Sequence, residues 1–158
     1  MSESQEETLQ AIDHLLRSES TMVISTCSHG DAPHATPLFY LTGAQFELYW
    51  FSSPSSIHSR NVAKAPEASA VVYAPTDQWQ RIRGVQMRGT VHKITQRTQR
   101  REISKAYCAR FDLGILFRAV MARNSLYVFR PCWVRYLDNT RAFGFKFETE
   151  LPILREAQ

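Results

Sequence analysis

Short strand-forming stretches, separated by turn residues, recur along this chain and constrain its fold more than any other feature. The clearest is GVQMRGTVHKI (84–94), in which apolar and polar residues alternate with the period of two that a half-buried strand requires. Apolar and β-branched runs predict further strands at 21–27, 32–41, 46–51 and 68–74. Because short strands with tight turns favour a sheet that closes on itself, we expect a mainly β, antiparallel barrel.

The strand pattern resumes near the end of the chain, after a helical insertion. LYVFR (126–130) and CWVRYLD (132–138) are strand-like, with a predicted break at Pro131, and FGFKF (143–147) follows. In the strand 32–41, two prolines each remove a backbone donor, which indicates an edge, a bulge, or a strand whose backbone faces something other than a neighbouring strand.

Three regions have the spacing of helices. Residues 8–18 place leucine and isoleucine on one face, and residues 56–65 form a short helix that stops before a proline. The insertion around 96–122 contains a helix over about 96–111, which Thr95 is expected to cap, and a second piece near 113–122.

Length and composition indicate one ordinary globular domain. The chain has 158 residues, of which 44% are hydrophobic and 22% charged, so we expect a single domain over 1–158 with residues 1–6 disordered. The acidic start is unlike a secretory signal, and no apolar run approaches the length of a membrane span. Three scattered cysteines (Cys27, Cys108 and Cys132) favour a reducing environment, so we expect a cytoplasmic protein with no membrane partner.

The net charge of +4 is unevenly distributed. Residues 81–110 contain nine Lys and Arg residues and one acid, whereas residues 1–20 contain five acids and one base. Such a basic block attracts anions, or it is simply a solvated helix face. Nucleic acid is the weaker interpretation, because the block lacks a zinc-finger pattern and the signature of an RNA-binding sheet.

The stretch WFSSPSSIHSR (50–60) joins a buried strand to a helix start through four serines and a proline. At a helix start, backbone N–H groups lack intrahelical partners and the helix dipole adds partial positive charge, so a phosphate site is physically reasonable. The alternative is that Ser55 or Ser56 merely caps the helix.

No catalytic constellation stands out in the sequence. The five histidines are His14, His29, His34, His58 and His92. None of them has metal-ligand spacing, so we expect no metal site, and neither Glu47 nor Asp138 belongs to a convincing acid–base pair. No nucleophile elbow, P-loop or dinucleotide fingerprint occurs. The chemistry therefore belongs to a bound cofactor, or there is none.

The order of PHATPLFY, FELYWFSS, SSIHSRNVAKAPEASAVVY and RGVQMRGTVHKI resembles the FMN-binding split β-barrels of the pyridoxamine 5'-phosphate oxidase-like family. The later VRYLDNTRAFGFKFE is similar to its uncharacterised, YhbP-like bacterial branch. The resemblance implies an antiparallel split barrel of six to seven strands, a homodimer, and FMN at the subunit interface.

The resemblance also implies cofactor-binding positions. They are Ala35, Thr36, Pro37, Phe51, Ser52, Ser53, Ser56, His58, Arg60, Arg83, Gly84 and Lys146. Lys146, with Trp133, would come from the partner subunit. Where many family members carry a basic pair, this chain has Ile57 and His58, so the positive charge would come from Arg60, Arg83 or Arg88.

The resemblance implies that the protein is an FMN-binding flavoprotein of oxidoreductase type. It assigns no catalytic residue, and the small-molecule substrate is unknown. Two alternatives stay open. One is a non-enzymatic protein that binds flavin or another anionic ligand. The other is a haem-binding or haem-degrading relative, with His58 or His92 as the ligand.

Overall fold

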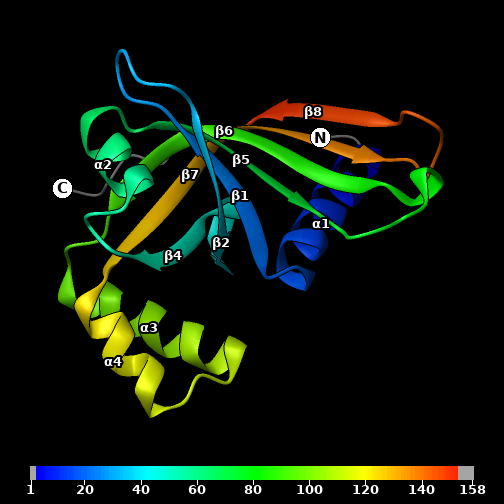
Figure 1. Ribbon diagram of the computed structural model, residues 1–158. Helices are drawn as coiled ribbons and strands as arrows, with labels where there is room; N and C mark the ends of the chain where they lie inside the picture. Colours follow the sequence, from blue (N-terminus) through cyan, green and yellow to red (C-terminus); the bar gives the residue numbers. More distant parts are fainter. Residues whose placement is uncertain (1–2, 153–158) are drawn as a thin grey trace.

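The computed structural model describes residues 3–152, in which a curved antiparallel sheet carries four α-helices (Figure 1). The strands are β1 (Thr21–Thr26), β2 (His34–Phe39), β3 (Leu41–Thr42), β4 (Leu48–Ser52), β5 (Glu67–Tyr73), β6 (Arg83–Lys93), β7 (Ser125–Asp138) and β8 (Lys146–Glu150). The helices are α1 (Glu3–Ser18), α2 (Ile57–Lys64), α3 (Arg97–Phe111) and α4 (Ile115–Arg123). Two 3-10 turns, η1 (Ala44–Phe46) and η2 (Trp79–Arg81), complete the described elements.

The sheet is curled until its two edges meet in one segment of the chain. Its order is β2-β1-β5-β6-β7-β4-β3; β4 pairs with the first half of β7, and β8 pairs with its second half. The edge strands β2 and β3 are consecutive and only Tyr40 separates them. The Tyr40 hydroxyl donates to the carbonyl of Leu16 at 2.6 Å, and Thr42 donates to the same oxygen at 2.8 Å. The predicted antiparallel split barrel is therefore confirmed, with the two-residue β3 among the strands.

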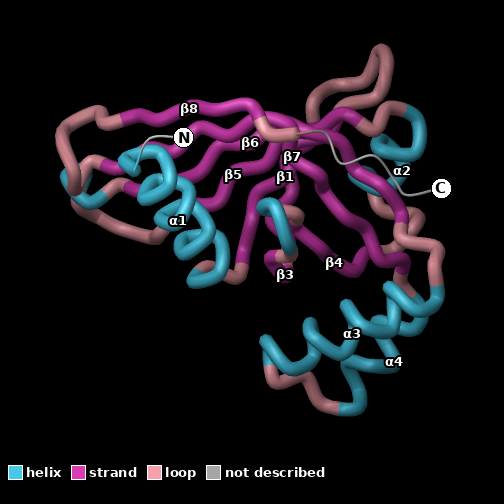
Figure 2. Tube along the Cα trace, turned by 180° about the vertical axis from the view of Figure 1, so that it is seen from behind, coloured by secondary structure: helices cyan, strands magenta, loops and turns pink. Residues whose placement is uncertain are grey.

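Alternation along the strands builds the core, as the sequence predicted. Val85, Met87 and Val91 of β6 are buried, while Gln86 and Arg88 between them are exposed. Helix α1 closes one end of the curled sheet with its own apolar face, including the fully buried Ile12 and Leu16 (Figure 2). Removing these side chains from water is what makes α1 stable in this position.

Helices α3 and α4 lie side by side and project from the sheet, away from α1 (Figures 1 and 2). Tyr107 fixes α3 to the sheet, because it is buried and its hydroxyl donates to the carbonyl of Phe39 at 3.1 Å. The predicted insertion is confirmed, but Thr95 is not its cap. Gln96 occupies the N-cap position and makes no side-chain capping bond.

Two further expectations are corrected by the structure. The predicted break at Pro131 is instead a bulge inside one continuous strand, because Arg88 of β6 faces Trp133 whereas Gly89 faces Pro131, which leaves Cys132 as the extra residue. Residues 3–6, expected to be disordered, form the first turn of α1, and residues 1–2 lie outside the described range. Within residues 3–152, no helix is both long and apolar enough to cross a bilayer.

Candidate functional site

The serine-rich turn leads from the end of β4 into the first turn of α2. Ser56 is the N-cap of α2, and its Oγ accepts a hydrogen bond from the backbone N–H of Ser59 at 3.3 Å. The capping role expected for Ser55 or Ser56 thus belongs to Ser56. The N–H groups of Ile57 and His58, which follow the cap, have no acceptor within the helix and are available to an anion.

His58 ties this turn to the sheet and does not face solvent. Its Nε2 lies 2.7 Å from the Ser52 hydroxyl and 3.0 Å from that of Ser56, and the residue is only 6% exposed. Burial, and then the nearby His34, lower the pKa of His58 below its ordinary value. A neutral, engaged imidazole supplies no positive charge to the turn near neutral pH.

Arg60 supplies positive charge at the turn instead. Its guanidinium donates a short hydrogen bond to the carbonyl oxygen of Ser55. Beside it, the exposed hydroxyls of Ser53 and Ser55 lie 2.8 Å apart. Exposed hydroxyls, a helix start and a guanidinium together form an arrangement that favours an anion.

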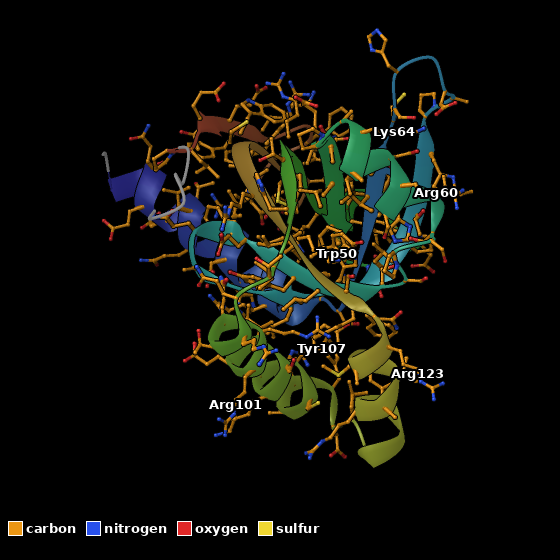
Figure 3. All side chains as sticks on the ribbon, turned by 90° about the vertical axis from the view of Figure 1, so that its left-hand side faces the viewer. Trp50, Arg60, Lys64, Arg101, Tyr107 and Arg123 are labelled. Atoms are coloured by element: carbon orange, nitrogen blue, oxygen red, sulfur yellow. The ribbon has the colours of Figure 1, made fainter. Side chains whose placement is uncertain are left out.

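Arg60 also lines a hollow of about 560 Å³ between α2 and the adjoining ends of β6 and β7. Lys64 and Lys93 line the same hollow, as do His92 and Tyr127. Figure 3 shows Arg60 and Lys64 on successive turns of α2. Sequence reasoning missed both lysines, although the four-residue spacing of Arg60 and Lys64 signals a shared helix face. Lys93 was not detectable in this way, because only tertiary pairing brings the end of β6 to α2.

The predicted positions on β2 join this region. Helix α2 contacts β1 and β2, and its Asn61 donates to Thr26 Oγ1 at 3.2 Å, directly beside the Thr26–His34 strand pair. Among the described strands, β2 is an edge strand paired only with β1, which explains how Pro37 is tolerated. The Thr36 hydroxyl is buried and has no partner in the described chain. An unpaired hydroxyl and a free backbone edge therefore lie beside α2.

Phe51, which was predicted to contact the cofactor, points away from this region. Its ring packs against Tyr107 of α3, with 5.3 Å between centroids, and under the guanidinium of Arg100 at 5.4 Å. Within one chain, Phe51 thus helps to dock α3.

Three other predicted residues gather at the opposite end of the sheet. Gly84 pairs with Leu137, which pairs with Lys146, and Arg83 is the next residue along β6. At roughly 3.3 Å per residue, the length of β6 separates Arg83 from Lys93 by about 33 Å. The glycine at position 84 is also explained by packing, because a Cβ there would lie 3.2 Å from the carbonyl oxygen of Val72.

Arg88 and Trp133 lie in the middle of the sheet, between these two ends. The Arg88 guanidinium stacks over the Trp133 ring at 4.2 Å, and Arg135 lies at 5.2 Å from the same ring. Ala35 pairs with Ser25, Ser25 pairs with Ser69, and Ser69 pairs with Arg88. Arg88 therefore lies three strands from β2, a separation of about 14 Å at ~4.8 Å per strand.

The two carboxylates considered in the sequence have structural partners. Glu47 forms a 3.0 Å ion pair with Arg130 and accepts from the Tyr49 hydroxyl. Burial alone would raise the pKa of Asp138, but hydrogen bonds from Thr140 and Tyr136 hold it below its ordinary value. Neither carboxylate lies at α2.

Comparison with known proteins identifies the fold and the family. Over its full length the chain superposes on the conserved hypothetical protein Rv2991 of Mycobacterium tuberculosis, with a TM-score of 0.73, 16% identity and 93% of that chain covered. A Clostridium acetobutylicum protein related to general stress protein 26, of the pyridoxinephosphate oxidase family, gives a TM-score of 0.68 at 13% identity, covering 92% of this chain and 96% of that one.

A haem-binding protein of Mycobacterium smegmatis is also similar in fold. The TM-score is 0.66 at 20% identity, over 86% of this chain and 55% of the haem-binding protein. No curated protein sequence matches. The profile of the family described as pyridoxamine 5'-phosphate oxidase matches residues 8–138. That span is most of the chain, and the protein is a member of the pyridoxamine 5'-phosphate oxidase family.

Proposed function

We propose that this protein is an FMN-binding flavoprotein whose cofactor phosphate is held beside α2, next to Arg60. The observation that carries the proposal is the convergence of Arg60, Lys64 and Lys93 on the hollow beside the serine-rich turn. Two or three such cations offset the absence of a basic pair at Ile57 and His58, because each charge-assisted bond to phosphate contributes about 1.5–3 kcal/mol. Membership of the family supports the same conclusion.

When bound, FMN would supply hydride or electron transfer, so the activity is of oxidoreductase type. The residues of this chain would bind and orient it. The unpaired edge of β2 at Ala35–Pro37 would offer backbone groups to the ring, and the buried Thr36 hydroxyl would gain a partner. Arg83, Gly84 and Lys146 would complete the site from the second subunit of a homodimer, because they lie too far away to do so within one chain.

An FMN titration of the purified protein, followed by flavin fluorescence, tests the proposal. Arg60→Ala and Lys64→Ala should each weaken FMN binding by about tenfold or more, since each removes a charge-assisted contact to phosphate. Arg81→Ala, which removes an exposed base outside the hollow, is the matched control. A wild-type protein that shows no micromolar FMN binding, or variants that bind as tightly as the wild type, would contradict the assignment.

Reduction by a nicotinamide separates an oxidoreductase from a protein that only binds flavin. Under anaerobic conditions, NADH or NADPH should bleach the absorption of bound FMN faster than that of free FMN. If bound and free FMN are bleached at the same rate, the protein binds FMN but does not promote its reduction by the nicotinamide.

Haem is the second candidate cofactor. Of the two histidines predicted to bind it, the structure favours His92 over His58. His58 Nε2 is buried between two serines, whereas His92 lines the hollow beside α2 and its Nε2 lies 2.9 Å from Thr90 Oγ1. A Soret band on haem titration that disappears in His92→Ala would favour haem over FMN, and absence of the band would exclude it.

A further inference from the structure

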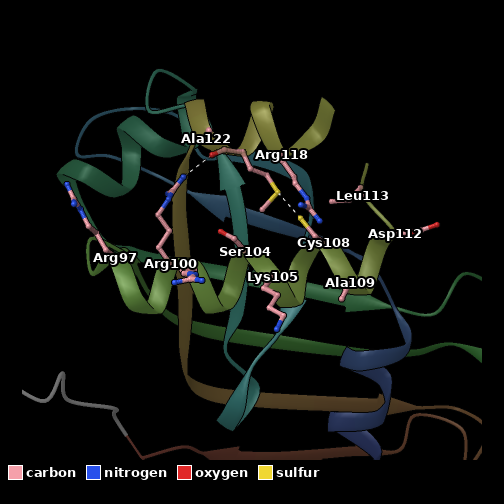
Figure 4. Close-up of a pocket in the computed structure, with 12 residues that line it drawn as sticks. Arg97, Arg100, Ser104, Lys105, Cys108, Ala109, Asp112, Leu113, Arg118 and Ala122 are labelled. Carbon is pink, nitrogen blue, oxygen red and sulfur yellow. Dashed lines mark hydrogen bonds between the residues drawn. The ribbon is translucent and has the colours of Figure 1, made fainter. Parts of the chain in front are cut away.

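A second cavity, of about 850 Å³, lies between α3 and α4, on the far side of α3 from the sheet. Figure 4 shows Arg100, Ser104 and Cys108 directed from α3 toward α4, with Arg118 directed back from α4. Tyr107 is absent from its lining, because that ring faces Phe51 and the sheet. The cavity therefore lies on a different face of α3 from the proposed flavin region.

The floor of this cavity is apolar. The Cys108 thiol donates to the Met121 thioether at 3.6 Å, and Ala109, Leu113 and Ala122 extend the apolar surface along the two helices. Its volume lies within the range of about 300–1,000 Å³ that is usual for small-molecule pockets. An apolar floor of this size accommodates a hydrocarbon chain.

The walls of the cavity are cationic. Arg97, Arg101, Lys105 and Arg118 line it, and none of the four forms an ion pair with an acid among residues 3–152. The acid in the lining is Asp112 at one end. With Arg100, which also lines the cavity, five cations against one carboxylate give it a positive potential, which favours an anionic ligand group.

Arg100 keeps the two helices in this arrangement. Its Nη2 donates to the carbonyl oxygens of Met121 and Asn124, each at 2.8 Å, at the C-terminal end of α4. These bonds reinforce the end of α4, where the Met121 carbonyl also accepts the backbone N–H of Asn124. The cavity is thus braced at the end near Arg100.

We propose that the α3–α4 cavity binds an amphipathic anion, an alkyl chain with one acidic head group such as a long-chain carboxylate. The chain lies on the Cys108–Met121 floor and the head group pairs with Arg118, while the cations of α3 contribute to the positive potential of the cavity. This assignment gives the basic block of residues 81–110 a ligand, and it does not depend on flavin binding.

Isothermal titration with dodecanoate below its micellar concentration tests the proposal. Dodecanoate should bind at least about tenfold more tightly than dodecanol, because only the carboxylate pairs with the cations. Dodecyl phosphate distinguishes a preference for carboxylate from recognition of any anionic head. Equal binding of dodecanoate and dodecanol, or no binding of either, overturns the proposal.

Variants locate the ligand within the chain. Ala122→Trp fills the cavity and should reduce dodecanoate affinity by about tenfold or more, whereas Ala119→Trp, on an exposed part of α4 outside the lining, leaves it within about twofold. Arg118→Ala should weaken dodecanoate but not dodecanol, and Arg123→Ala, a base of α4 that does not line the cavity, is its control.

Cysteine labelling gives an independent readout of the position. In a Cys27→Ser/Cys132→Ser background, Cys108 is the one remaining thiol. Dodecanoate should slow its alkylation by about tenfold near saturation, since the chain would cover the sulfur. Unchanged alkylation, or Ala122→Trp affinity equal to that of the wild type, places the ligand elsewhere and overturns the proposal.

Discussion

At the scale of single residues, His58 has a structural role, although a histidine at a helix start would suggest a source of positive charge. Its imidazole links the end of β4 to the start of α2 through Ser52 and Ser56. In a buried position the neutral form is favoured, because protonation would leave a charge without solvent. Ser52 and Ser56, which the sequence suggested as anion ligands, therefore already form hydrogen bonds with this histidine.

This arrangement predicts a pH-dependent stability. Since the folded-state pKa of His58 lies below the unfolded value of about 6.5, the unfolded chain binds more protons, and stability is full above pH ~6.5 and falls as the pH drops through the window below it. Urea denaturation at pH values between about 7.5 and 5 should show a shallower decline for His58→Asn than for the wild type. His14→Asn, on the exposed surface of α1, controls for the loss of a histidine as such. Identical slopes for the wild type and His58→Asn would disprove this role.

At the scale of elements, the β6–β7 pair is organised around the bulge at Cys132. Gly89 lies opposite the bulge, and a Cβ at this position would approach the carbonyl oxygen of Arg130 to 2.1 Å. The neighbouring atoms are backbone, so the contact is not relieved by turning a side chain. The bulge thus requires a glycine here for reasons of space.

Gly89→Ala should therefore lower the free energy of unfolding by about 2 kcal/mol or more, because one of the two strands must shift. Gly114→Ala is the matched control, because no atom lies within 4 Å of a Cβ there, and we expect a change below about 1 kcal/mol. Equal effects in chemical denaturation would mean that the bulge accommodates a side chain.

The attachment of α3 to the sheet is the second feature at this scale. Tyr107→Phe removes the hydrogen bond to Phe39 but keeps the ring against Phe51, so it should cost about 0.5–1.5 kcal/mol. Tyr107→Ala also removes the buried ring and should cost about 3–5 kcal/mol. Thermal denaturation of the two variants separates the contributions, and a similar cost for both would show that the ring does not anchor α3.

Periodicity predicted most of the elements because their stability comes from alternate burial. The buried Val85, Met87 and Val91 were predicted from the order of residues alone. The continuity of β7 through Pro131 was not, since it depends on the partner strand and on Gly89. Among the site residues, Ser56 and Arg60 lie where the local sequence placed them. Lys93 reaches the same hollow only through pairing between distant strands.

At the scale of the whole molecule, the predicted cofactor residues fall into two groups at opposite ends of the sheet. Arg60 and its neighbours lie at α2, whereas Arg83, Gly84 and Lys146 lie about 33 Å away by strand length. Our proposal that both groups contact one FMN requires two subunits. Every site of such a dimer would take its α2 from one chain and its Lys146 from the other.

Subunit mixing tests this arrangement. Arg60→Ala and Lys146→Ala homodimers should each bind FMN weakly, because each damages both sites. After free exchange about a quarter of all sites should regain wild-type affinity, since half of the dimers are mixed and each of these has one intact site. No recovery, in a mixture whose exchange is verified by mass, would show that Arg60 and Lys146 serve different sites or none.

The meeting of the two sheet edges at Tyr40 also affects which insertions the protein tolerates. Residues 34–42 carry β2 on one side of Tyr40 and β3 on the other, so one added residue would change the register of both edges relative to each other. The loop between β1 and β2 joins paired neighbours and has no such constraint. Natural length variation in relatives, and grafted peptides in engineered versions, should accordingly accumulate in residues 28–33 and be absent around Tyr40.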